Sequence, residues 1–133
     1  MSGKDYWKIA TKVHSARLRT FVWTPDREIW GKPDYWPSRN EIPPIGELFY
    51  EDCDGFETAC YYDLEDMGEY PLSVICNIRR GVPSTCHAVC SLKGYILDNR
   101  YRRVWHWTQL DYEWIMAGRH GGKWHRIIGT ERR

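Results

Sequence analysis

The spacing of apolar residues near the start of the chain predicts a helix. Apolar side chains recur there every three or four residues, the spacing of one helix face, so we expect a helix over about residues 4–16, with a strand as the alternative. Residues 18–24 are predicted to form a strand, residues 24–26 a turn and residues 28–31 a short return strand. The apolar positions that indicate the helix are Tyr6, Ile9, Ala10 and Val13.

Prolines interrupt this pattern between residues 33 and 44, where four of them exclude a regular helix or central strand and predict an ordered surface loop. After the loop, residues 47–51 and 56–63 are predicted to be the two arms of a hairpin. Both arms carry aromatic residues that can pack across a strand pair, and the acidic segment 52–55 between them resembles a turn.

The second half of the chain consists of short apolar runs separated by turn residues at hairpin spacing. Paired glycines at Gly121 and Gly122 permit the positive φ that a tight hairpin needs. A helix over residues 110–117 is the alternative for one of these runs. The predicted strands are residues 72–79, 85–92, 94–97, 101–108, 112–119 and 123–129.

These elements predict an α+β, strand-rich fold: a single antiparallel sheet of hairpins with one or two short helices. Short turns leave little room for the crossover helices of a parallel sheet. The length of 133 residues indicates a single domain, residues 1–133, with enough buried surface to fold without metal or disulfides. Disorder is not expected, because 8 Trp and 9 Tyr supply large apolar surfaces for a core.

Membrane and secreted proteins are not indicated by this pattern. No apolar run approaches the roughly 18 residues of a membrane span. Residues 1–13 contain lysines and an aspartate in place of the apolar stretch of a secretory signal. We therefore expect an intracellular protein with reduced cysteines.

Five cysteines are present, and four of them suggest a zinc site as a weaker alternative. Six residues separate the first pair and three separate the second, whereas zinc ribbons place about two to four in both. We therefore expect small buried side chains and no cofactor. The four residues of the alternative site are Cys53, Cys60, Cys86 and Cys90.

Charge is divided unequally along the chain, although the formal net charge is only +1. An acidic half, residues 1–70, has 8 Lys+Arg and 14 Asp+Glu, whereas a basic, aromatic half, residues 71–133, has 11 and 4. No basic residue lies between Arg39 and Arg79, a window that contains ten acids. If these acids share one face, they would attract a basic partner. Pairing with the chain's own basic half is the alternative.

Two sets of residues are the candidate binding sites. The first is an acidic docking surface for a basic protein, and the second combines cations with aromatics, as phosphate contact plus base stacking requires. The aromatic residues of the second set also fit a half-buried strand. The acidic set is Glu51, Asp52, Asp54, Glu57, Asp63, Glu65 and Asp66. The basic set is Arg100, Arg102, Arg103, Arg119, Lys123, Trp124 and Arg126.

Two segments carry a characteristic order of residues. In residues 36–50, Trp36 precedes Glu41-Ile42-Pro43, and Gly46 leads into a predicted strand; residues 104–110 read Val-Trp-His-Trp-Thr-Gln-Leu. Over residues 36–110 this order resembles a family of small phage and prophage proteins of unknown function. The stretch between the segments is longer here, and a proline expected after the last leucine is absent. The resemblance implies a mobile-element accessory protein in a bacterial cytoplasm and assigns no catalytic residue.

We expect a protein that binds rather than an enzyme, because no catalytic motif occurs. The first hypothesis is an accessory protein that binds and obstructs a basic, nucleic-acid-handling host protein or complex, as an anti-defence or host-takeover inhibitor would. Direct nucleic-acid binding by the basic, aromatic half is the alternative. No membrane partner is expected.

Overall fold

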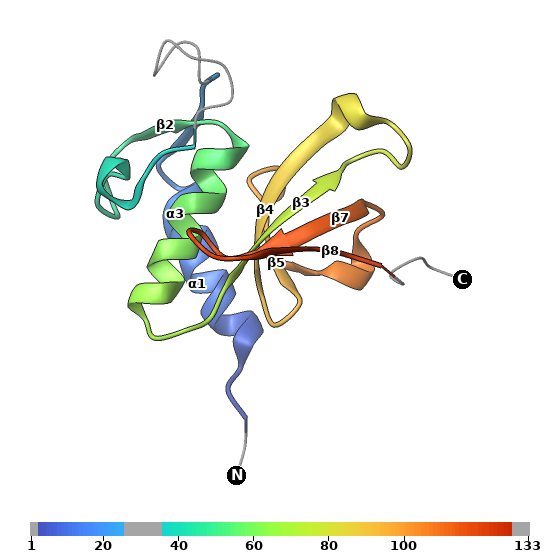
Figure 1. Ribbon diagram of the computed structural model, residues 1–133. Coiled ribbons are helices and arrows are strands. Elements are labelled where there is room, and N and C mark those ends of the chain that lie inside the picture. Colours follow the sequence, from blue (N-terminus) through green and yellow to red (C-terminus); the bar gives the residue numbers. More distant parts are fainter. Residues whose placement is uncertain (1–2, 26–35, 129–133) are drawn as a thin grey trace.

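An antiparallel sheet in the strand order β6-β5-β4-β3-β7-β8 dominates the computed structural model, which describes residues 3–25 and 36–128 (Figure 1). Within these residues, two α-helices and a separate pair of parallel strands complete the fold and confirm the α+β, strand-rich class. The sheet consists of β3 (Leu72–Asn77), β4 (Cys86–Leu92), β5 (Tyr95–Leu97), β6 (Trp105–His106), β7 (Glu113–Gly118) and β8 (Trp124–Arg126).

The first helix, α1 (Tyr6–Leu18), confirms the prediction from apolar spacing and excludes the strand alternative. It begins where the Asp5 side chain accepts a hydrogen bond from the backbone N–H of Lys8 at 3.0 Å, which satisfies one free donor of the first turn. Ala10 and Val13 are buried, so the predicted apolar face is the one that packs.

The second helix, α3 (Cys53–Asp66), shows that the predicted hairpin over residues 47–63 is wrong. The Asp52 side chain accepts hydrogen bonds from the backbone N–H groups of Asp54 and Gly55, so the acidic segment caps a helix instead of forming a turn. Buried residues then follow at helix spacing. They include Phe56, Ala59, Cys60 and Leu64.

A short parallel pair joins β1 (Phe21–Trp23) to β2 (Phe49–Glu51), with Phe21 opposite Phe49. The strand expected over residues 18–24 is therefore confirmed for residues 21–23, with β2 as its partner, whereas Leu18 is the last residue of α1. The return strand expected at residues 28–31 lies outside the described residues. A 3-10 turn over Arg39–Glu41 lies in the proline-containing connection to β2.

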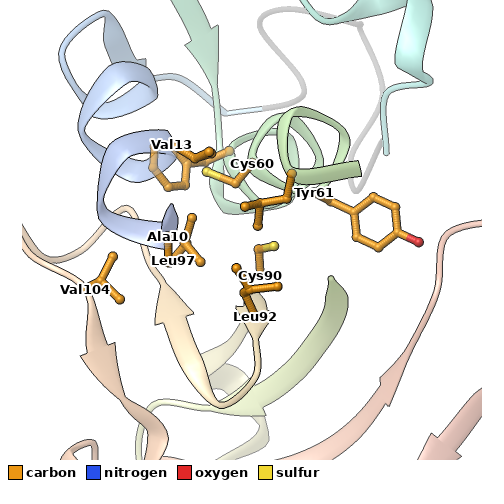
Figure 2. Packing of buried hydrophobic residues seen from close by; sticks show 10 residues of the cluster. Ala10, Val13, Cys60, Tyr61, Cys90, Leu92, Leu97 and Val104 are labelled. Carbon is orange, nitrogen blue, oxygen red and sulfur yellow. The ribbon is translucent and has the colours of Figure 1, made fainter. Parts of the chain in front are cut away.

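The two faces of the sheet are covered differently. Helices α1 and α3 lie against one face, and the core between them and the sheet includes Ala10, Cys60 and Leu97 (Figures 1 and 2). The opposite face carries a second cluster that includes Val74, Ile96 and Trp114. Neither described α-helix covers this second face, and Leu72 at its edge is exposed.

The β7–β8 hairpin forms as its paired glycines predicted, and Gly121 has a φ of +76°. The alternative helix over residues 110–117 is wrong, because β7 pairs with β3 along its length. The pairing shifts by one residue between Ile75 and Cys76, which identifies a β-bulge.

Candidate functional site

All seven residues of the predicted acidic docking surface have partners within the chain or are buried. Glu51 and Glu57 are only 2% and 0% exposed. Asp52 caps α3, and the Cys53 thiol donates a hydrogen bond to Asp54. The fold therefore does not present these seven residues together as one acidic surface.

The remaining three acids form ion pairs along α3. Asp63 accepts two hydrogen bonds from the Arg17 guanidinium, at 2.6 and 2.8 Å, and both side chains are nearly buried. Glu65 pairs with Arg39 at 3.2 Å and with Arg119 at 2.8 Å. Asp66 pairs with Arg39 at 2.6 Å. Arginines from both halves of the chain thus pair with three acids of the window.

A buried pair joins α3 to the turn of the β7–β8 hairpin. The Glu57 carboxylate lies 2.9 Å from Nε2 of His120, and the rings of Trp36, Tyr61 and Tyr62 surround the imidazole at centroid distances of 4.5 to 5.8 Å. Burial raises the pKa of Glu57 above its ordinary value of 4.5, although the hydrogen bond to His120 opposes this shift. This contact fixes the hairpin turn against the helix.

A second buried network lies at the other end of β7. The Asp98 carboxylate accepts hydrogen bonds from His87 at 2.7 Å, from the Tyr112 hydroxyl at 2.5 Å and from the backbone N–H of Arg100 at 2.9 Å. Burial by itself would raise the pKa of Asp98, but these hydrogen bonds outweigh it and hold the pKa below its ordinary value of 3.8. The network connects β4 to the segments that follow β5 and precede β7.

The predicted basic set is divided between the two ends of β7. Arg100 hydrogen-bonds the Tyr112 hydroxyl, just before β7 begins, and the exposed Arg102 and Arg103 belong to the same loop. Arg119 and Lys123 belong to the turn where β7 ends. The fold therefore does not bring the seven residues to one surface.

At the turn end, a basic hollow of about 580 Å³ opens on the surface. Its lining includes five basic residues and no acid, and no described residue forms an ion pair with Lys123 or Arg126. Arg119 also lines it but already binds Glu65. Trp124 does not line the hollow, because its ring packs over Gly118, where a β-carbon would meet it. The basic residues of the lining are Arg119, His120, Lys123, His125 and Arg126.

An apolar hollow of about 250 Å³ adjoins the basic one on the face that the helices leave uncovered. Leu72, Ala117 and Ile127 line both, so the two form one continuous groove. Trp107 and Trp114 line its apolar end. We call the combined surface the β7–β8 groove.

The structure gives no support for the zinc alternative. Within the described part of the chain, which contains all four of its cysteines, no three potential ligands come together in a way that could hold a metal ion. Cys60 and Cys90 are completely buried between α3 and the sheet (Figure 2). Burial raises the pKa of both thiols well above the usual value, so both remain small, protonated side chains of the core.

Sequence reasoning identified Arg119, Lys123 and Arg126 but missed the apolar part of the groove. Leu72 begins β3 and Ile127 directly follows β8, so the two are distant in sequence, and neither has a local signal that marks it as part of a groove. The Glu57–His120 pair was also missed, because its members are 63 positions apart in the sequence.

Comparison with family models gives no match, and comparison with curated proteins gives none either. The resemblance to phage proteins therefore stays a prediction. Among the described residues, no helix has the length and apolar character needed to cross a membrane. The functional argument thus depends on the geometry of the β7–β8 groove.

Proposed function

We propose that the protein binds nucleic acid through the β7–β8 groove. The single observation that supports this most strongly is the basic hollow, where Lys123 and Arg126 have no described acidic partner. Cations that are not already paired attract phosphate and release counterions when they bind it. The proposal keeps Arg119, Lys123 and Arg126 from the predicted basic set, adds His125, and leaves out the loop with Arg102 and Arg103.

The competing hypothesis, an acidic surface that obstructs a basic host protein, has less support. Arg17 already pairs with Asp63, Arg39 with Asp66 and Arg119 with Glu65. A basic partner would have to displace these arginines, so most of the expected attraction is already satisfied inside the chain. An anti-defence or takeover role stays a prediction.

The test is the affinity of the protein for labelled nucleic acids of mixed sequence, measured by fluorescence anisotropy between about 50 and 200 mM salt. We expect affinity to fall as salt rises. The double variant Lys123→Glu/Arg126→Glu should bind at least about tenfold more weakly. Its salt slope, log K against log salt, should also be shallower by about 1.4 on a single strand, since two phosphate contacts are lost.

Arg102→Glu/Arg103→Glu is the matched control, because it makes the same change in formal charge on exposed residues at the other end of β7. It should bind nearly as well as the wild type. Equal losses in both double variants would show that net charge alone drives binding, and absence of binding by the wild type would reject the proposal.

A further inference from the structure

The β7–β8 groove consists of a basic part and an adjoining apolar part. The basic hollow can hold a phosphate, and the apolar hollow next to it is lined by Trp107, Trp114 and Ile96. Because Leu72, Ala117 and Ile127 belong to both linings, a ligand that occupies the groove contacts both kinds of surface at once.

The apolar hollow is formed by the fold itself. Gly94 has a φ of +89°, and a β-carbon there would lie 3.2 Å from the Trp107 ring, so glycine permits the ring's close approach. The backbone N–H of Trp107 donates to the Gly94 carbonyl at 2.9 Å. Trp114 packs against Tyr112 at a centroid distance of 5.4 Å. Two tryptophans are therefore held in place before any ligand arrives, which limits the entropy cost of binding.

The hairpin is not free to enter a duplex groove. A two-stranded ribbon can read the major groove only if it projects from the protein. Here the hairpin turn lies against α3 (Figure 1), held by the His120–Glu57 contact and by the Arg119–Glu65 ion pair at 2.8 Å. Both described α-helices pack on the opposite face of the sheet, so neither is placed to insert beside the basic hollow.

We propose that the β7–β8 groove selects single-stranded nucleic acid, with an unpaired base in the apolar hollow and a neighbouring phosphate in the basic hollow. The inference rests on the nucleic-acid binding proposed above. A duplex keeps its bases stacked inside and would leave the apolar hollow exposed to water. An unpaired base brings an apolar, stackable face together with its phosphate, and stacking of this kind tolerates different sequences.

The test compares three labelled ligands by fluorescence anisotropy at one salt concentration: a single strand, the duplex made from it, and an abasic strand with the same number of phosphates. We expect the single strand to bind roughly tenfold more tightly than the abasic strand, because only the stacked base differs. We also expect it to bind more tightly than the duplex.

A variant pair locates the effect. Ala117→Met should fill the junction of the two hollows and remove the preference for the single strand over the abasic strand. Ala16→Met on α1, the same exchange on the helix side of the sheet, should retain it. Circular dichroism of both variants confirms that they fold.

Each outcome has a distinct meaning. Equal affinity for all three ligands, or a preference for the duplex, would overturn the single-strand inference while nucleic-acid binding stands. Loss of the preference in Ala16→Met as well as Ala117→Met would also overturn it. If the protein binds none of the three ligands, both the proposed function and this inference are rejected.

Discussion

Helix α3 and the β7–β8 hairpin carry opposite charges, and the fold uses those charges differently. On α3, Glu57, Asp63 and Glu65 each contact a basic side chain of the same chain. On the hairpin, Lys123 and Arg126 have no described acidic partner. The comparison shows that density of charge along a sequence does not determine surface charge, because partners from distant segments can neutralise one region and leave another available.

The largest effect is predicted for a change at Arg17, which is 4% exposed and binds both carboxylate oxygens of Asp63. Arg17→Met keeps much of the side-chain volume but leaves Asp63 without its cation. We expect the free energy of unfolding, measured in urea, to be about 3–5 kcal/mol lower than in the wild type. The reason is that the charged Asp63 carboxylate remains almost buried without its cation. Arg17→Met/Asp63→Leu should recover most of this loss. A loss below about 1 kcal/mol in the single variant would show that the pair is not a structural contact.

A second prediction concerns Asp98, a buried acid of the basic half. Its pKa is held below 3.8 in the folded protein, so the unfolded chain binds the proton more readily. The charged Asp98 carboxylate therefore contributes its full stabilisation of the folded protein above pH 3.8. This contribution is lost as the pH falls through the lowered pKa. Asp98→Asn should lower stability near neutral pH by about 2–3 kcal/mol, because three hydrogen bonds lose their charged acceptor.

The measurement is urea unfolding of wild type and Asp98→Asn from neutral pH to below pH 3.8. The variant should lose less stability than the wild type over the acid end of this range. Parallel pH curves would mean that Asp98 does not contribute to the acid dependence. Asn is close to Asp in size, so a difference in slope reports on the charge and its hydrogen bonds.

The smallest effect is expected at Arg39, whose contacts with Glu65 and Asp66 are exposed. Exposed ion pairs contribute little, because water and salt screen them. Arg39→Ala should therefore leave the midpoint of urea unfolding within experimental error of the wild type. A clear drop would indicate that stacking of Arg39 over the Tyr62 ring, at 4.6 Å, stabilises this region more than its exposure suggests.

Local signals in the sequence were sufficient for α1 and for the hairpins of the sheet. Apolar residues at helix spacing identified Ala10 and Val13, and the paired glycines identified the turn between β7 and β8. Both features act within a few residues of the chain, so periodicity and turn chemistry can reveal them.

Helix α3 was mispredicted because its start resembles a turn. Asp52 and Gly55 are typical turn residues, and Phe56, Tyr61 and Tyr62 are common in strands. In the fold, Asp52 caps the helix, and Gly55 lies against the Glu51 side chain with no room for a β-carbon. Packing on the sheet then selects the helix over the strand preference of its aromatic residues.

The candidate site was only partly predictable for a related reason. Its cations follow one another closely in sequence and could be identified, whereas the groove needs strands that meet only in the folded sheet. The pairing of acids on α3 likewise depends on distant contacts, since Arg17 and Asp63 are 46 positions apart in the sequence. Such pairings carry no local pattern.

The most direct test of the contrast between the two regions is a ¹⁵N NMR titration of the protein with a short single strand. We expect the largest amide shifts along the β7–β8 groove, at residues 117–127 and around Leu72 and Trp107, with small shifts on α3. Largest shifts on α3, or in the loop with Arg102 and Arg103, would contradict the assignment of the available charge to the hairpin.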